Sequence, residues 1–586
     1  MKLLAPLLLF LFFSFQLVAQ PTTTEKLTYF FEQVEAFDKH PQDSLYRGLH
    51  PRGEWSANTD EKAIAKAESY RDFLEVLGSF SAADLTRQEQ ISQTVMQLKL
   101  QDQIDNIDYR MHLIPFNAEG GFYSNLSYVM PKLPFERLED YEAYLGWIPS
   151  YASSLRQNTD LMRQGLKEGI ISPKPIASNI LGALDTWAPK AIEDSPLFEP
   201  FARLHEGFSD ESPVGLRESS KKELIAKGKA ALQLVNKEYS ALRTFVKTEY
   251  LPAAPEKPGV GFLPKGQAYY ENRIQYYTTL PLTADSVHQL GLQEVARIRT
   301  AMEGVIKEVN FEGSFAEFIA FLRTDEQFYA KTPEELLRRA AWISKQAEGQ
   351  LPKLFNKLYS LPFTVAPVPA SLEKTYTGGR YVPGSWKQKR PGTYWVNTYD
   401  LKSRTLYTLP ALTVHEAVPG HHLQGALAAE IKGIPPFRNR YYISAFGEGW
   451  GLYSEFLGEE MGIYTTPYEL FGRYTYEMWR ACRLVIDTGI HSKGWSREKA
   501  QKYLAENTAL SLHEVHTEID RYIAWPGQAV SYKIGELQIK HLREVASTTL
   551  GDKFDLRAFH AVVLKNGSVP LGVLEAEVMD WVAGVE

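Results

Sequence analysis

The sequence has almost no cysteine: Cys482 is the only one among 586 residues. A single thiol excludes an intrachain disulfide and a thiolate-rich zinc finger. Any metal ion would therefore be held by histidine and carboxylate side chains. We expect Cys482 itself to be a small buried apolar residue.

An excess of positive charge is also missing. Lysine and arginine number 64 against 71 aspartate and glutamate residues, which gives a formal net charge of -7, and the chain has no block of basic residues. Surfaces that bind nucleic acid or anionic membranes concentrate lysine and arginine. We therefore expect neither nucleic acid nor an anionic membrane as the main partner.

Several catalytic signatures are absent as well. The chain contains no G-x-S-x-G nucleophile elbow, no paired cysteine and histidine signature and no glycine-rich phosphate loop. These absences argue against serine hydrolases, cysteine hydrolases and P-loop nucleotide enzymes.

The one long apolar run lies at the N-terminus. Residues 1–19 combine a positive charge at Lys2, an apolar stretch that ends near Val18 and the small residue Ala19, which is typical of a secretory signal peptide. The run is short of the ~20 residues that a membrane span needs, and no cysteine follows it. We expect cleavage near Gln20, no lipid anchor, and a protein exported to the periplasm or secreted.

Helical periodicity dominates the rest of the chain. Apolar residues recur every three or four positions over segments far longer than strands, namely 91–111, 141–168, 221–250 and 286–307. A further helix is expected from Thr332, because Thr332, Pro333 and Glu335 form an N-cap, a first-turn proline and a capping-box glutamate. The sequence therefore predicts a mainly α fold.

Residues 251–266 are dense in proline and glycine and are the best candidate for a domain boundary. The boundary would separate an N-terminal helical part, residues 20–260, from a second part, residues 261–586. The same stretch could instead be a long loop within one continuous body. Residues 361–391 are also loop-rich and lead into strand formers at 393–397, which predicts a small β-sheet.

Three histidines lie within eight residues, in T-V-H-E-A-V-P-G-H-H: His415, His421 and His422, with Glu416 beside the first. A metallopeptidase needs two imidazoles aimed at one metal ion and a carboxylate close to the attacking water, which H-E-x-x-H provides within one helical turn. Here Pro419 occupies the position of the second histidine, so that simple motif is absent.

The longer spacing fails on a straight helix. Six residues would place His421 about 9 Å along the axis and about 240° around it from His415. Pro419 disrupts helical hydrogen bonding and Gly420 tolerates almost any backbone angle, so we expect a bulge or break that restores the pairing. His422 is the alternative second ligand, because seven residues return it to nearly the same helical face as His415.

A third ligand is expected from I-S-A-F-G-E-G-W-G-L-Y-S-E-F-L. Glu448 is the candidate, because it stands among glycines at 447, 449 and 451, which are poor helix formers and suggest a close approach of backbone or ion. Glu455 lies on the same face seven residues later. It could bond a ligating histidine and fix its tautomer, or it could be a solvated carboxylate.

These residues carry a family resemblance. H-E-x-x-P-G-H-H-L-Q at 415–424, followed by G-E-G-W-G-L-Y-S-E at 447–455, resembles a bacterial domain-of-unknown-function family treated as metallopeptidases of the gluzincin type. The second segment is similar to the N-E-G-x-A-x-Y-x-E helix that supplies the third zinc ligand of gluzincin aminopeptidases. Gly420-His421 resembles the end of an H-E-x-G-H helix with two residues inserted.

The resemblance extends over most of the mature chain and implies a fold and a site. The implied fold is a large, mainly α, two-lobed zinc-peptidase-like body with a deep cleft. The implied site holds one zinc ion by His415, His421 and Glu448, with Glu416 as the general base.

Substrate contacts are expected from two further segments. Residues 521–535 bring together four candidate donors for the oxyanion, Tyr522, Tyr532, Gln528 and Arg521, of which Tyr532 is preferred. The tyrosines could equally be packing residues, and Arg521 could be ion-paired.

On the predicted strand, Tyr394 and Asn397 could bind a peptide by strand addition. Arg521, or Arg380 in G-G-R-Y, could hold a C-terminal carboxylate.

The sequence thus predicts an exported zinc metallopeptidase that acts on peptides or oligopeptides. Two other functions use the same ligand types: a non-haem iron oxygenase with two histidines and one carboxylate, and a non-catalytic protein that binds zinc or peptides. Glu416 favours the peptidase, because an oxygenase has no need of a carboxylate next to its first histidine.

Overall fold

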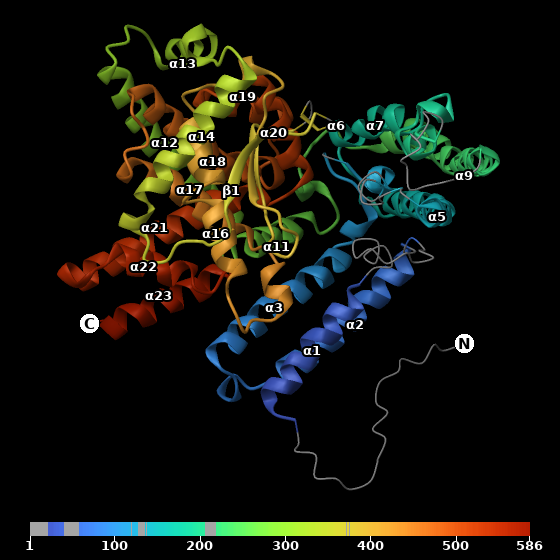
Figure 1. Ribbon diagram of the computed structural model, residues 1–586, viewed down its shortest axis with the longest axis horizontal. Helices are drawn as coiled ribbons and strands as arrows, with labels where there is room; N and C mark the ends of the chain where they lie inside the picture. The colour runs from blue at the N-terminus through green and yellow to red at the C-terminus, as the bar shows by residue number, and fades with distance from the viewer. Residues whose placement is uncertain are drawn as a thin grey trace.

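The computed structural model describes residues 21–39, 55, 58–118, 120–126, 130, 135, 137–204, 218–370, 372–373 and 376–585. The expected signal peptide, residues 1–19, lies outside these ranges. Within them, no helix combines the length and the apolar character that a membrane crossing requires. The described residues form a mainly helical fold with a small three-stranded sheet, as the sequence predicts (Figure 1).

The first part of the chain forms helices that occupy two regions of the molecule. The long helices α2 and α3 pack side by side together with α1, and α5, α7 and α9 gather at one end of the molecule (Figure 1). The helices of this part are α1 (Thr23–Phe37), α2 (Asp60–Gly78), α3 (Arg87–Asp108), α5 (Leu138–Glu168), α6 (Lys174–Ala177), α7 (Asn179–Trp187), α8 (Glu199–Ala202), α9 (Glu218–Phe245) and α10 (Leu251–Ala253).

The second part builds around α18, which packs against α12, α15, α19 and α20. Its helices are α11 (Gly266–Thr278), α12 (Ala284–Glu308), α13 (Phe315–Thr324), α14 (Pro333–Leu354), α15 (Leu409–Glu416), α16 (His421–Ala429), α17 (Ser444–Glu460), α18 (Pro467–His491), α19 (Arg497–Asn507), α20 (Leu512–Ala524), α21 (Ser531–Leu550), α22 (Leu556–Leu564) and α23 (Leu571–Val585).

The helices predicted from periodicity are confirmed as α3, α5, α9 and α12, and the helix predicted from its capping residues is confirmed as α14. The start of α14 follows from its sequence: the Thr332 side chain accepts a hydrogen bond from the backbone N–H of Glu335, and Pro333 takes the first helical position. The Glu335 carboxylate accepts from the N–H of Lys331 rather than from that of Thr332. The helix ends at Leu354.

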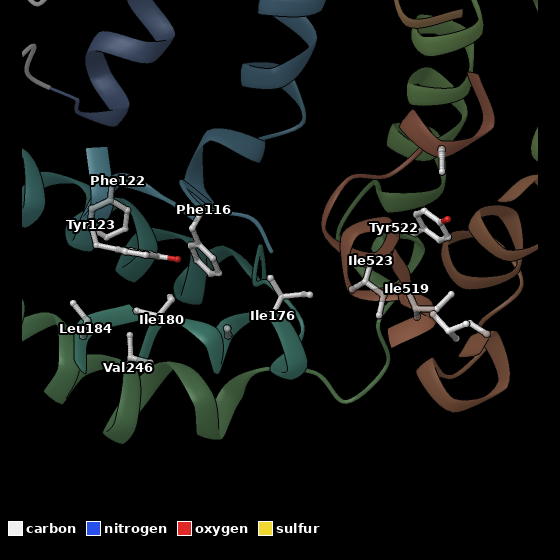
Figure 2. Packing of buried hydrophobic residues seen from close by; sticks show 14 of the residues in the cluster. Phe116, Phe122, Tyr123, Ile176, Ile180, Leu184, Val246, Ile519, Tyr522 and Ile523 are labelled. Carbon is white, nitrogen blue, oxygen red and sulfur yellow. The ribbon is translucent and has the colours of Figure 1, made fainter. Parts of the chain in front are cut away.

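Two large clusters of buried apolar side chains hold the helices together, and each contains residues from both sides of residue 260. One joins α5, α7 and α9 to α18 and α20, and part of it is shown in Figure 2, where Ile176 faces Ile519 and Ile523 across the contact. The other joins α1–α3 to α14, α17 and α21–α23. The 251–266 segment therefore connects parts of the chain that share their cores.

The sheet comprises β1 (Phe363–Pro367), β2 (Gly379–Val382) and β3 (Gly392–Val396) in the order β1-β3-β2. β3 lies in the centre, parallel to β1 and antiparallel to β2, with Tyr381 opposite Tyr394. β2 is thus an edge strand of the sheet that the described residues form, and it lies beside α15.

A cluster of buried charges links α12, α18 and α21. The ammonium group of Lys533, which is fully buried, lies 2.7 Å from Glu477, 2.6 Å from Glu536 and 3.0 Å from Glu294. Arg473 binds the other oxygen of Glu477 at 2.6 Å. Buried charges are tolerated when each is paired in this way, so the cluster fixes how these three helices pack.

Helices α17 and α21 approach so closely that glycines are required at their contact. A Cβ atom at Gly535 would lie 1.9 Å from the carbonyl oxygen of Ala445, and one at Gly449 would lie 2.6 Å from the Cα of Gly535. Both obstacles are backbone atoms, which cannot rotate away. The two helices can therefore pack in this way only while both positions lack a side chain.

We predict that Gly535→Ala lowers the free energy of unfolding by about 2–3 kcal/mol, because the added methyl overpacks a backbone contact. The matched control is Gly304→Ala on α12, where an added Cβ meets nothing within 4 Å. Alanine is the better helix former, so this variant should match or exceed the wild type by up to about 1 kcal/mol. Urea unfolding of both variants measures the difference, and equal destabilisation would contradict the close contact.

Asp487 is a buried carboxyl on α18 with an unusual proton affinity. One of its oxygens accepts from the Tyr270 hydroxyl at 2.6 Å and from the N–H of Gly527 at 3.0 Å. Burial raises the pKa of Asp487 to about 7, although these hydrogen bonds act in the opposite direction. In the unfolded chain the pKa would be about 3.9.

This difference makes stability depend on pH. Between about pH 4 and pH 7 the fold holds a proton on Asp487 that the unfolded chain has released, so stability falls as pH rises, by at most about 1.4 kcal/mol per pH unit. Asp487→Asn keeps the acceptor oxygen and removes the titration. We predict that the variant gains stability relative to the wild type as pH rises from 4.5 to 7.5, measured by urea unfolding. If the free energies of unfolding of the variant and the wild type change with pH in parallel, the raised pKa of Asp487 is contradicted.

Candidate metal centre

The histidine segment is broken between two helices. α15 ends at Glu416 and α16 begins at His421, as expected from Pro419 and Gly420. The backbone folds back tightly between them, because the N–H of Gly420 donates to the carbonyl of Val414 at 3.0 Å. A Cβ atom at Gly420 would lie 1.8 Å from the carbonyl oxygen of His415, so only glycine fits this turn.

The break brings three potential ligands together. Nε2 of His415 and Nε2 of His421 lie 3.6 Å and 3.4 Å from the same oxygen of Glu448, which comes from α17. The two imidazole rings are nearly perpendicular, with centroids 4.7 Å apart. One ligand atom from each residue lies within 4.8 Å of the other two, and no other such group of three occurs in the described part of the chain.

These distances match the ligand set of a tetrahedral metal. With bonds of about 2.0–2.2 Å, tetrahedral zinc separates its ligand atoms by about 3.3–3.6 Å. Both measured separations fall within this range. Two imidazoles and one carboxylate also leave a fourth position, which is the composition of catalytic rather than structural zinc sites.

Glycines of α17 allow this arrangement. A Cβ atom at Gly451 would lie 2.5 Å from the His415 ring, and one at Gly447 would lie 2.2 Å from the Tyr442 ring. Of the alternating glycines around Glu448, Gly447 thus faces Tyr442, Gly449 faces α21 and Gly451 faces His415. The sequence predicts a close approach here, and the structure identifies what approaches.

Two residues hold the far side of His415. Its Nδ1 lies 2.8 Å from the carboxylate of Glu455, which is itself 3.2 Å from the guanidinium of Arg480. Because Nδ1–H donates to Glu455, Nε2 carries the lone pair that a metal needs. Glu455 is therefore buried against the cluster and is not a solvated carboxylate.

Glu416 and Glu448 are each fixed by a hydrogen bond. One oxygen of Glu416 accepts from the backbone N–H of Tyr381 on β2 at 2.8 Å. The second oxygen of Glu448 accepts from the Tyr442 hydroxyl at 3.0 Å. Neither Tyr381 nor Tyr442 is indicated by the sequence motifs, because both contacts depend on segments that meet only in the fold.

Without a metal, the cluster holds protons and charge. Burial disfavours a charged imidazole, but the carboxylates of Glu448 and Glu455 outweigh it and raise the pKa of His415 to about 10. Burial likewise disfavours a charged Glu448, yet His415 and His421 lower its pKa well below the usual value. A metal cation would replace the proton in balancing the carboxylates.

His422 lies outside the cluster. Its ring packs against Tyr359 and Phe363, with centroids 4.5 and 4.6 Å apart, and its Nδ1 lies 3.2 Å from the Tyr381 hydroxyl. Burial lowers its pKa to about 4. The interpretation of His422 as second ligand is therefore wrong, because consecutive residues of a helix point about 100° apart and only His421 faces Glu448.

The 521–535 segment reaches the start of α17. Gln528 donates to the hydroxyl of Ser444, one helical turn before Glu448, and accepts from Arg521 at 2.7 Å. Arg521 also lies 3.4 Å from the Tyr532 hydroxyl and 3.3 Å from Glu518. Arg521 thus has the predicted ion pair and also faces Tyr532.

Tyr522 does not fit the role of an oxyanion donor. It is buried in the core, where its hydroxyl accepts from Trp479 and from Arg483, each at 2.8 Å. Neighbours in sequence on one helix face different sides, so Arg521 and Tyr522 cannot both face the same site. The hydroxyl instead connects α20 to α18.

Tyr394 and Asn397 do not bind a peptide by strand addition. Tyr394 is buried on β3, which already has a partner strand on each side. The Asn397 amide donates to the carbonyls of Glu373, Tyr376 and Thr377 and so braces the loop before β2. Arg380 lies on β2 opposite Trp395, with an exposed side chain.

The chain belongs to DUF885, a family of bacterial proteins of unknown function, whose family model matches residues 41–578. No curated protein matches the sequence. A crystal structure from Colwellia psychrerythraea, provisionally described as a lipoprotein, has a TM-score of 0.85 at 28% identity and covers 96% of this chain and 100% of its own. A protein from Shewanella oneidensis, provisionally described as a lipoprotein of unknown function, has a TM-score of 0.73 at 18% identity over 95% and 100%.

We predict that His421→Gln abolishes stoichiometric zinc binding, whereas His422→Gln retains it, because only His421 faces Glu448. The adjacent residue is the matched control, since both substitutions alter the same helix turn. Metal content after purification without chelators, followed by competition with a zinc-binding dye, measures the difference. Loss of zinc from His422→Gln alone would reverse the assignment.

Proposed function

We propose that this protein is an exported zinc-dependent peptidase. The observation that carries the proposal is the tetrahedral spacing of His415, His421 and Glu448, with the Glu416 carboxylate next to the first ligand in sequence and fixed by β2. Export rests on the signal-peptide pattern of residues 1–19. The proposal also includes the two-lobed helical body that the family resemblance implies, with a cleft that would lead to the cluster.

His415, His421 and Glu448 would hold the zinc ion, and Glu455 and Tyr442 would keep two of these ligands in orientation. When bound, zinc would polarise the substrate carbonyl and acidify a water molecule. Glu416 accepts the proton of the attacking water and returns it to the leaving amine. The hydrogen bond from Tyr381 holds one oxygen of Glu416 in place during both transfers.

The outer edge of β2 supports a peptide as substrate. Residues of an antiparallel strand alternate between those bonded to the partner strand and those facing outward. The carbonyl of Gly378 accepts from the N–H of Asn397, so the backbone of Gly378 is bonded to β3. Tyr381 lies three residues later, at a position that faces away from β3, and its N–H donates to Glu416 there. A peptide extended along this edge would bring its backbone next to the proposed general base.

Tyr532 is the candidate to stabilise the oxyanion, as proposed from the sequence. Its neighbour Arg521 donates to the phenol oxygen and would hold the hydroxyl in position. Tyr442 is not a second candidate, because its one hydroxyl proton is donated to Glu448. Preorganised donors of this kind typically contribute about 100-fold or more to the rate of acyl transfer.

We predict that Glu416→Gln lowers peptide hydrolysis by at least about 100-fold while zinc stays bound, because glutamine is isosteric but accepts no proton. The experiment is a mass-spectrometric cleavage profile of a mixed peptide library with zinc-loaded wild type and variant. Removal of zinc by a chelator should abolish wild-type cleavage, and zinc should restore it.

Three results would count against the proposal. Purified protein without stoichiometric metal would remove its basis. Equal cleavage by wild type and Glu416→Gln would contradict the role of Glu416. If neither cleaves while both hold metal, an oxygenase or a non-catalytic zinc or peptide binding protein becomes the better interpretation.

A further inference from the structure

A cavity of about 450 Å³ lies where α3, the 251–266 segment, α11 and the end of α20 meet. Its volume falls within the range of ligand pockets. Figure 2 shows three of its lining residues, with Phe116 and Ile176 on one side and Ile523 on the other. Nothing described so far uses this space.

Aromatic and aliphatic side chains make up most of the lining. They include Phe262, Leu263, Tyr269, Tyr277, Ile523 and Trp525. Of the three charged side chains, Arg273 and Asp102 pair with each other at 2.6 Å. The exposed Lys257 places its ammonium 4.5 Å from the Phe262 ring. The cavity therefore offers mainly apolar contact, with the Lys257 ammonium as a cation in its lining.

Trp525 and Tyr277 form a preorganised wall. The indole N–H donates to the Tyr277 hydroxyl, which fixes one ring against the other. Trp525 nevertheless remains 40% exposed. Behind it, Asp487 accepts from the N–H of Gly527 and anchors the turn. A rigid, exposed aromatic ring on a fixed turn is suited to contact with an apolar ligand group.

Two paths of contact connect this wall to the metal cluster. On α11, Tyr276 precedes Tyr277, and its hydroxyl lies 3.0 Å from that of Tyr441, whose neighbour Tyr442 bonds Glu448.

The second path runs along the turn that follows α20 and contains Gly527. Gln528 follows Trp525 by three residues and donates to Ser444 at the start of α17. On the same side, the Arg521 guanidinium lies 5.6 Å from the Trp525 ring and 3.4 Å from the hydroxyl of Tyr532, the proposed oxyanion donor. A few residues of extended peptide, at about 3.3 Å each, would span from this wall to that hydroxyl.

The geometry points to this cavity as the binding site for a bulky apolar side chain of the substrate, aromatic or branched aliphatic, a few residues from the bond that is cut. The inference rests on the proposed peptidase function and adds its substrate class: peptides with a large apolar residue at one fixed distance from the cleavage point. Peptides with a small or a positively charged residue at that position are poorer substrates.

The first test is a positional scan of peptides in which each residue in turn is phenylalanine, leucine, serine, aspartate or lysine. Wild-type kcat/KM is expected to favour phenylalanine or leucine over serine by about tenfold or more at one position, which is what a hydrophobic pocket provides. Trp525→Ala should reduce that ratio to about twofold. Trp342→Ala removes an exposed tryptophan of α14 that does not line the cavity and should leave the ratio unchanged.

A second variant, Ala253→Trp, tests the same cavity without removing Trp525, so the test does not depend on the folding of Trp525→Ala. Ala253 lines the cavity and is exposed, so a bulky replacement fills the space without entering the core. It should also reduce the preference. A wild type without positional preference, or a preference that survives both substitutions, would overturn the inference while leaving the peptidase proposal intact.

The second test does not need catalysis. Zinc-loaded Glu416→Gln is titrated with matched peptides that carry phenylalanine or serine at the same position, and affinity is followed by calorimetry. The phenylalanine peptide should bind about tenfold more tightly, and the added substitution Trp525→Ala should abolish the difference. If the wild type cuts no peptide but this difference is found, the proposed function fails and the apolar site stands. If both peptides bind equally, the site is wrong.

Discussion

The position of α17 between α15 and α21 is the constraint on which the candidate metal site of His415, His421 and Glu448 depends. On one side Gly451 lies under the His415 ring, and on the other Gly449 lies against the backbone of Gly535. Glu448 directly precedes these two glycines on the same helix. The position of its carboxylate is therefore set by the packing of the helix rather than by its flexible side chain alone. Glu455, two turns later, reaches Nδ1 of the same histidine. One helix thus supplies a ligand and also the support of another ligand.

The same packing explains why His415 and His421 can both approach one oxygen of Glu448 across a broken helix. α15 and α16 have independent axes, joined by the turn that Gly420 permits. The rings meet at the Glu448 oxygen from different directions. In a continuous helix, six residues would have carried His421 about 9 Å away and to another face. The break is therefore the feature that converts an unsuitable spacing into a cluster.

The sequence predicted what depends on local pattern. Periodicity located α3, α5, α9 and α12, capping residues located the start of α14, and Pro419 with Gly420 located the helix break. The sequence favoured His421 over His422 but did not exclude His422, because the choice depends on backbone angles within the turn. It also missed Tyr442 and the bond between Tyr381 and Glu416, since these join segments that are distant along the chain. Strand formers marked β3 correctly but gave no sign that it would be the central strand.

Lys533 has a consequence for how sequences of this family can diverge. Its ammonium group contacts Glu294, Glu477 and Glu536 from three helices, and all four side chains are buried. Arg297 and Arg473 pair with the same carboxylates, so the set contains three cations and three anions. Losing one member leaves an unbalanced charge, whereas an apolar replacement of the whole set can be neutral. Change at these positions is therefore expected to be concerted: relatives should keep these residues together or have exchanged them together, and chains that mix the two versions should be rare.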